Sequence, residues 1–228
     1  MNIVFDFDGT IANSTPYHKA GWTSTLKELN IKCDLNVLLP YEANLQERFD
    51  SYRRIKKGFM GKDDVKNMVQ SFFLTENEDL LANKIMDLKE SLTITKILEE
   101  SLPNTLNSLG ENLMVLIEEL RTQGEKIGVI SSTRETIINC FLYKCGILDY
   151  FDFVIGEESL TDRECVLRDK PNPYAKVALK KINQSMDVYI GDNKSIDGEF
   201  AEACGVAFVF ADYKTNFIDL KSKITLQK

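Results

Sequence analysis

The chain has 228 residues, of which 43% are hydrophobic, so it is long enough for one core domain of ordinary size and a smaller second one. Its net charge of −7 argues against DNA or RNA as a main partner, because such binding relies on a basic surface. No apolar run approaches membrane-spanning length, and Asp6 and Asp8 interrupt the run that a signal peptide would need, so we expect a soluble cytoplasmic protein without a membrane partner.

The first ten residues predict a buried strand that ends in an acidic turn. Residues 3–5 are apolar, and the sequence from Asp6 through Asp8 to Thr10 follows at once. Side chains alternate along a strand, so both acids share one face at the carboxyl end, where open α/β sheets bind ligands. One carboxylate could bind a hard metal and attack a substrate while the other carries a proton. Taken alone, the motif also fits an acidic turn after an edge strand.

The following segment predicts helices and no convincing strand. Cap residues and a proline at 13–16 precede a helix that ends near Asn30. Helical periodicity then recurs three times, at about 45–55, 63–72 and 80–88. We therefore expect residues 14–102 to form an inserted helical domain with a small core of its own.

From Pro103 onward, apolar runs alternate with helical patterns. Strands are predicted at 127–130, 151–156, 188–191 and 206–210. Helices are predicted around 113–120, 137–142, 177–179 and 200–203, and a loop at 157–173. This alternation predicts an α/β fold with a parallel sheet in a three-layer αβα, Rossmann-like core, which residues 1–13 and 103–228 would form together.

Two polar positions near predicted strand ends suit a phosphoryl group. Ser131 follows a buried strand, and its hydroxyl and nearby backbone N–H groups could contact a phosphate oxygen. Taken alone, however, Ser131 is better explained as a cap of the next helix. Lys170 precedes Pro171 and could supply a fixed positive charge, although an isolated lysine is more commonly a solvated surface residue.

Further acids follow the predicted strand that ends at Gly191. Asp192 comes directly after this strand and Asp197 lies five residues further on. Together with Asp6 they offer the oxygen ligands that Mg²⁺ prefers. Asp197 could instead cap the helix that follows it.

These four segments resemble, in order and spacing, the four motifs of the haloacid dehalogenase superfamily. The resemblance covers essentially the whole chain and implies that Asp6 is a nucleophile that forms an aspartyl-phosphate. It implies that Asp8 protonates the leaving oxygen and then activates water. It also implies that Mg²⁺ is bound by Asp6, the backbone carbonyl of Asp8, Asp192 and Asp197. The phosphoryl group would be bound by Ser131, Ser132 and Lys170, and Lys170 would also be catalytic.

The insertion resembles the helical cap of subfamily I, in the group of phosphoglycolate phosphatase and β-phosphoglucomutase-like proteins. Residues 16–18 and Trp22 resemble the entry to that cap, where a histidine touches the substrate in some members. This makes His18 a candidate substrate contact, with packing at the hinge as the alternative. The cap is locally basic, and Arg48 is a candidate for a second anionic group of the substrate, although a solvated helix face explains most such residues.

The resemblance implies a Mg²⁺-dependent phosphatase that acts on a small phosphorylated metabolite, as a monomer or homodimer. Asp8 favours phosphoryl transfer over dehalogenation, because a halide leaves without a proton and an alkoxide does not. Gly191 stands where the mutases have a glutamate, which favours a phosphatase. A β-phosphoglucomutase-like phosphomutase is the enzymatic alternative, and a non-catalytic binding or regulatory protein is the other.

Overall fold

The computed structural model describes residues 1–28, 78–160 and 170–225. The chain divides into two compact units, which we call the core unit (Met1–Pro16 with Ile97–Lys228) and the inserted unit (Tyr17–Lys96). The predicted helices at about 45–55 and 63–72 lie outside the described residues. The domain bounds 14 and 102 stay a prediction.

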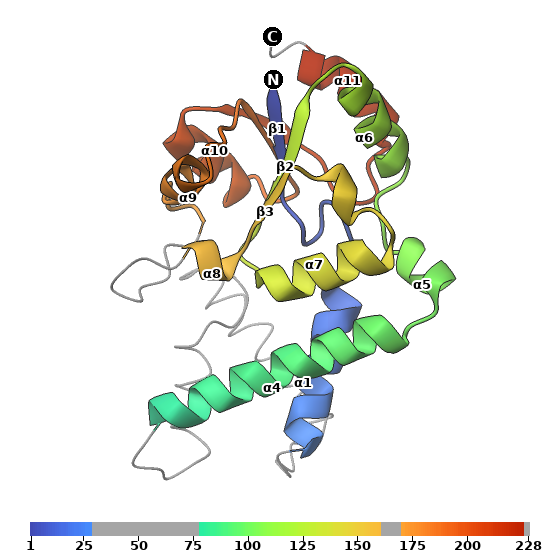
Figure 1. Cartoon of the computed structure of the whole chain (residues 1–228), viewed down its shortest axis with the longest axis vertical. Helices are drawn as coiled ribbons and strands as arrows, with labels where there is room; N and C mark the ends of the chain where they lie inside the picture. Colours follow the sequence, from blue (N-terminus) through green and yellow to red (C-terminus); the bar gives the residue numbers. More distant parts are fainter. Residues whose placement is uncertain (29–77, 161–169, 226–228) are drawn as a thin grey trace. The chain divides into compact units, whose positions relative to one another are not determined.

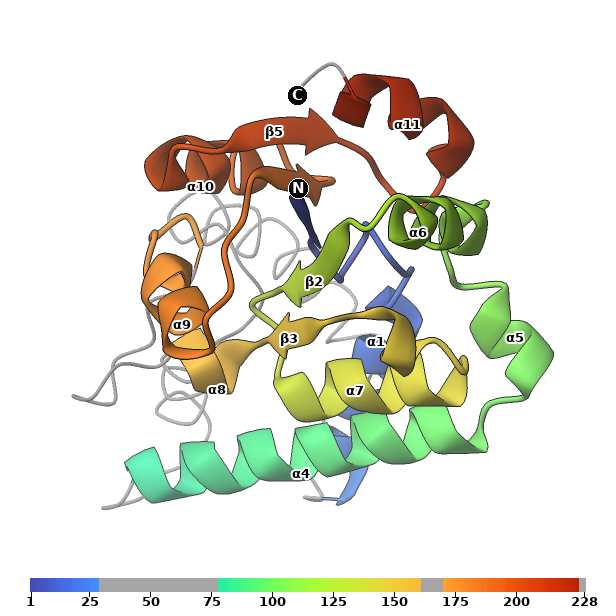
Figure 2. The same cartoon turned by 45° about the horizontal axis from the view of Figure 1, so that its top comes forward.

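The core unit is built on a five-stranded parallel sheet, as predicted, with the order β3-β2-β1-β4-β5 (Figure 2). Its strands are β1 (Asn2–Phe5), β2 (Lys126–Ile130), β3 (Phe153–Ile155), β4 (Val188–Gly191) and β5 (Ala207–Phe210). Helices cover both faces, which is why β1, β2 and β4 read as continuous apolar runs rather than as alternating ones. The predicted α/β fold class is confirmed.

One face of the sheet is covered by α8 (Glu157–Leu160), α9 (Ala175–Lys181) and α10 (Asp197–Cys204). Apolar residues of these helices pack with Tyr189 and other sheet residues in one buried cluster. The predicted loop at 157–173 is wrong at its start, because residues 157–160 form α8. This helix is a single turn held by the buried Leu160, and one apolar residue gives no periodic signal.

The other face carries α6 (Leu113–Thr122), α7 (Glu135–Lys144) and α11 (Phe217–Thr225) (Figures 1 and 2). The rings of Phe5 and Phe217 lie 6.3 Å apart, and those of Phe7 and Phe141 lie 5.5 Å apart, edge to face. Short turns complete the unit, namely α5 (Leu102–Leu106) and the 3₁₀ turn at Leu148–Tyr150. In this three-layer arrangement the helices cover the faces of the sheet, so the residues that follow the carboxyl ends of the strands are available to form a site.

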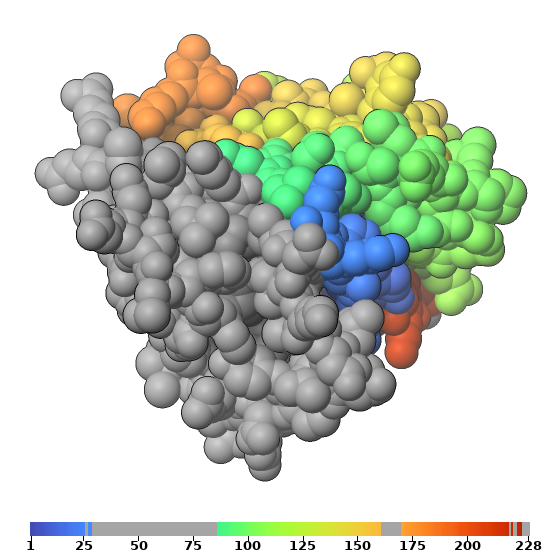
Figure 3. Space-filling view, turned by 90° about the horizontal axis from the view of Figure 1, so that it is seen from below, coloured from blue at the N-terminus to red at the C-terminus, as the bar shows by residue number. Residues whose placement is uncertain are grey.

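The inserted unit contains two described helices, α1 (Thr15–Glu28) and α4 (Glu78–Glu99), which each begin or end at the border with the core unit. Gly21 of α1 faces Thr93 of α4 so closely that a Cβ atom would clash with the threonine hydroxyl. The two helices are therefore packed in direct contact, as the blue and green surfaces in Figure 3 show. No helix in the described ranges combines the length and apolarity that a membrane crossing requires.

Candidate active site

A buried ammonium group joins three segments at the carboxyl end of the sheet. Lys170 Nζ donates hydrogen bonds to Asp6 Oδ1 at 2.8 Å, to Asp197 Oδ1 at 2.7 Å and to the hydroxyl of Tyr189 at 2.9 Å. Asp6 directly follows β1, and its backbone N–H donates to Ile190 O of β4 at 2.8 Å. This ties the turn after β1 to the neighbouring strand and aims Asp6 at the lysine.

Lys170 is 7% exposed, so it is not the solvated surface lysine that the sequence left as an alternative. Burial alone would lower its pKa, but Asp6, Tyr189 and Asp197 raise that pKa well above its ordinary value. The lysine therefore stays charged at neutral pH. Sequence reasoning missed Tyr189, whose hydroxyl donates to Ile130 O at 2.8 Å, because a tyrosine within an apolar run is indistinguishable from a core residue.

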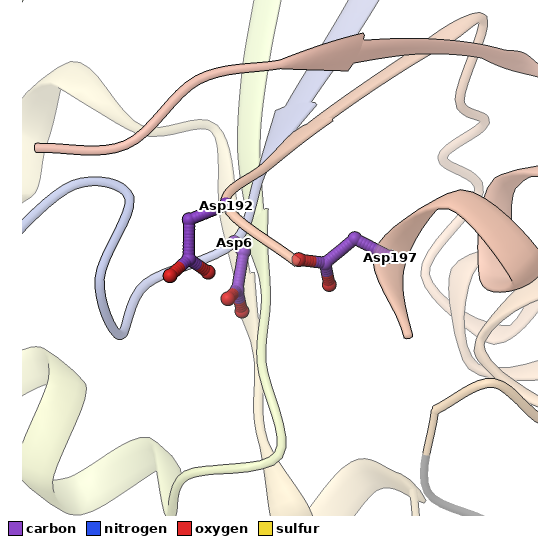
Figure 4. A group of neighbouring side chains, drawn as sticks. All are labelled: Asp6, Asp192 and Asp197. Atoms are coloured by element: carbon purple, nitrogen blue, oxygen red, sulfur yellow. The ribbon is translucent and has the colours of Figure 1, made fainter. Parts of the chain in front are cut away.

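Three carboxylates gather beside this lysine. Asp6, Asp192 and Asp197 each place one oxygen within 4.8 Å of the others, and Figure 4 shows them converging from three segments. Asp197 lies in the first turn of α10 and accepts the backbone N–H of Asn193 at 3.0 Å, in the loop before that helix. Carboxylate oxygens are hard ligands, so these residues fit a divalent cation such as Mg²⁺.

Burial raises the pKa of two of these acids. Desolvation raises the pKa of Asp6, with Asp197 and Asp8 adding to the effect and Lys170 opposing it. Burial, followed by the charge of Asp197, raises the pKa of Asp192 to about 6. A cation at this site would relieve the repulsion between the three carboxylates.

The affinity of the protein for Mg²⁺ is expected to fall as the pH drops through about 6. Below that pH Asp192 holds a proton, which a bound cation must displace, and the raised pKa of Asp6 acts in the same direction. Displacement of one proton gives about a tenfold loss of affinity per pH unit. Calorimetric titration with MgCl₂ between pH 5 and 8 measures this, and equal affinity at both ends would contradict the prediction.

Two glycines make room for the carboxylates. Gly9, at φ +76°, lies so close to Asp192 that a Cβ atom would approach its carboxylate closer than 3.0 Å. Gly191 stands in the same relation to the carboxylate of Asp197. A side chain at either position would displace a candidate metal ligand.

Gly191→Ala is therefore expected to weaken Mg²⁺ binding by about tenfold or more, because Asp197 must move aside. Calorimetric titration of the two proteins at pH 7.5 measures the change. Gly198→Ala is the matched control, since a Cβ there meets only Phe208 at an ordinary 3.6 Å. Equal Mg²⁺ affinity in the Gly191→Ala variant and the wild type would contradict the proposed role of this glycine.

Hydroxyl groups surround the second acid. The carboxylate of Asp8 accepts hydrogen bonds from Ser14 and Thr133, and from Ser131 Oγ at 3.3 Å. The structure thus places Ser131 against Asp8, and Ser132 lies half-buried on the same loop between β2 and α7. Sequence reasoning missed the roles of Ser14 and Thr133, since their meeting at Asp8 depends on contacts between distant segments.

The two candidate substrate contacts lie in the inserted segment. His18 is on α1, and its Nδ1 lies 3.0 Å from Nζ of Lys89 on α4. Arg48 lies outside the described residues. The part of both residues in substrate binding stays a prediction.

Fold and site together define an α/β enzyme whose carboxylates and buried lysine meet at the carboxyl end of a parallel sheet. Residues 3–211 match the family described as haloacid dehalogenase-like hydrolase, and the chain belongs to this family. The predicted family resemblance is confirmed.

Two curated relatives have different activities. A phosphoglycolate phosphatase of Cereibacter sphaeroides is 27% identical over 207 residues, which cover 90% of this chain and 82% of the relative. The β-phosphoglucomutase of Bacillus subtilis is 23% identical over 177 residues, covering 75% of this chain and 64% of the relative. Together with the family, the phosphatase relatives identify the chain as an enzyme of the phosphatase type.

Solved structures share the fold. CbbY from Rhodobacter sphaeroides in complex with phosphate superimposes with a TM-score of 0.66 at 17% identity, covering 93% of this chain and 87% of CbbY. β-Phosphoglucomutase from Clostridium difficile gives a TM-score of 0.61 at 20% identity, covering 100% of this chain and 99% of that one. At these identities the likeness concerns the fold alone.

Proposed function

We propose that the protein is a Mg²⁺-dependent phosphatase that hydrolyses a small phosphorylated metabolite through an aspartyl-phosphate on Asp6. The observation that carries this proposal is the contact of Asp6 with the buried, charged Lys170, at the strand end where Asp192 and Asp197 also converge. A buried carboxylate held at a fixed place by an ammonium group is suited to attack, because its position and charge are both set in advance.

In the first step an oxygen of Asp6 attacks phosphorus, and the bond between phosphorus and the ester oxygen breaks. Asp8 gives its proton to that oxygen, so the alcohol leaves neutral. In the second step water attacks the aspartyl-phosphate, Asp8 takes the proton of the water, and inorganic phosphate and free Asp6 are formed. Lys170 and the hydroxyls of Ser131 and Ser132 hold the phosphoryl oxygens, whose charge the ammonium group offsets.

Asp6, Asp192, Asp197 and the backbone carbonyl of Asp8 would hold Mg²⁺. When bound, the ion supplies positive charge that screens the repulsion between a carboxylate and the phosphate dianion. We further propose that residues 14–102 serve as a cap domain that excludes water during the first step, with His18 and Arg48 as its candidate substrate contacts.

Phosphoglycolate is the first substrate to test, because several of the similar proteins are phosphoglycolate phosphatases. Phosphate release from phosphoglycolate, sugar phosphates and nucleotides, measured with and without Mg²⁺, tests the proposal. Release that requires Mg²⁺ and favours one compound supports it. Conversion of β-glucose 1-phosphate to glucose 6-phosphate with little free phosphate would replace it with the mutase function of the Bacillus subtilis relative.

A further inference from the structure

The carboxylate of Asp8 is held on both of its oxygens. The hydroxyl of Ser14 donates to Oδ1, while the hydroxyls of Thr133 and Ser131 donate to Oδ2. All three donors are buried, at 3%, 8% and 1% exposure respectively. Contacts at both oxygens fix the rotation of the carboxyl plane as well as the direction in which the side chain points.

The donors come from two segments that are themselves anchored. Ser14 lies at the end of the turn after β1, and its backbone N–H donates to Ala12 O at 3.0 Å. Thr133 lies in the loop between β2 and α7, and its carbonyl accepts the N–H of Glu157 at 3.1 Å. The orientation of Asp8 therefore depends on two parts of the core unit that are far apart in sequence.

The type of donor differs between the two acids of the first motif. Asp6 contacts an ammonium group, which can only donate and so favours the charged carboxylate. The hydroxyls that contact Asp8 can donate to a carboxylate and can equally accept from a protonated carboxyl group. A residue that gains and loses a proton in every cycle needs partners that serve both states, and hydroxyls meet that need.

The three hydroxyls are not equivalent. The hydrogen bond from Ser131 Oγ to Asp8 Oδ2 is the longest of the three, at 3.3 Å. The same Ser131 oxygen also accepts the backbone N–H of Thr133 at 3.2 Å. If Ser131 turns to a phosphoryl oxygen, Asp8 still has one hydroxyl at each of its oxygens. Ser14 and Thr133 are thus sufficient to hold Asp8 while a substrate occupies Ser131.

We propose that Ser14 and Thr133 are positioning residues that orient the carboxyl group of Asp8 for proton transfer to the leaving oxygen. The inference rests on the proposed phosphatase function and adds to it a device that sets which leaving groups the enzyme expels. Esters of poor leaving groups, such as alkyl phosphates, need the proton, whereas nitrophenolate leaves without one.

The test compares kcat/KM for phosphoglycolate and for p-nitrophenyl phosphate in the holoenzyme with Mg²⁺. For each ester, kcat/KM reports the formation of the aspartyl-phosphate, which is the step in which the leaving group departs. Thr133→Val and Ser14→Ala are each expected to lower kcat/KM for the alkyl ester by about 10- to 100-fold, a part of the full effect of general acid catalysis. For the aryl ester the expected loss is about threefold or less.

Three further sets of variants make the result specific. Thr133→Ser and Ser14→Thr keep the hydroxyl and are expected to restore the wild-type selectivity between the two esters. Thr105→Val is the matched control, because Thr105 is a buried threonine whose hydroxyl donates to Ser101 O, within a helical turn. Asp8→Asn removes the acid completely. We expect it to lower kcat/KM for the alkyl ester more than for the aryl ester, by a larger factor than the Ser14 and Thr133 variants do.

Equal losses for both esters in folded Thr133→Val and Ser14→Ala proteins would overturn the proposal, since they indicate a structural or phosphate-binding role. If Thr133→Val does not fold, Ser14→Ala alone decides in the same way. If phosphoglycolate is not a substrate, the alkyl phosphate that the metabolite panel identifies takes its place in the test. A wild-type protein that releases phosphate from no compound of the panel would instead overturn the proposed function itself, and this inference with it.

Discussion

Asp6→Asn is expected to abolish phosphate release, with a loss of about 10³-fold or more, because the amide cannot form the aspartyl-phosphate. The fold should persist, since the amide oxygen can still accept a hydrogen bond from Lys170, which keeps Asp197 and Tyr189 as partners. Phosphate release and circular dichroism of the purified variant measure the two effects.

Asp187→Asn is the matched control for this substitution. Asp187 precedes β4 at the opposite end of the sheet, where its carboxylate accepts the backbone N–H of Asn2 at 2.7 Å. This variant should keep its turnover. Activity close to that of the wild type in Asp6→Asn would show that Asp6 is not the nucleophile.

Lys170→Met is expected to reduce both turnover and stability. The substitution leaves Asp6 and Asp197 buried without their ammonium partner, and breaking a buried ion pair on one side costs about 3–5 kcal/mol of unfolding free energy. Turnover should fall by about 10²-fold or more, because the charge that offsets the phosphoryl oxygens is lost. Urea unfolding of the metal-free protein and phosphate release measure the two losses.

Lys176→Met provides the comparison, because Lys176 also makes a part-buried hydrogen bond, to Cys204 O at 2.8 Å, but contacts no acid of the site. Its stability should change far less than that of Lys170→Met. The double variant Lys170→Met/Asp197→Asn should recover part of the lost stability, since it removes one of the two unpaired charges. A Lys170→Met protein as stable as the wild type would show that the buried pair is not needed.

The sheet and the position of its acids could be predicted from the sequence for a simple reason. The strands are short apolar runs, and the carboxyl ends of parallel neighbours must lie side by side, so Asp6 and Asp192 are brought together by topology alone. Asp197 was harder to assign, since the sequence left capping of the following helix open as an alternative, and its contact with Lys170 depends on the folded structure.

Contacts between distant segments could not be predicted. The meeting of Ser14 and Thr133 at Asp8, and of Tyr189 with Lys170, depends on the packing of whole elements rather than on any local pattern. Helix α11 is different, because buried Phe217, Leu220 and Ile224 follow a helical spacing that the sequence already contains. That helix was missed although its signal was present.

We propose that the carboxyl end of the parallel sheet is a phosphatase site. The most direct test measures phosphate release from phosphoglycolate and a panel of other phosphorylated metabolites, with Mg²⁺ and with excess chelator. We expect Mg²⁺-dependent release that favours one compound and disappears in Asp6→Asn. Release that is unchanged by the chelator or by Asp6→Asn would contradict it, as would the absence of release from every compound.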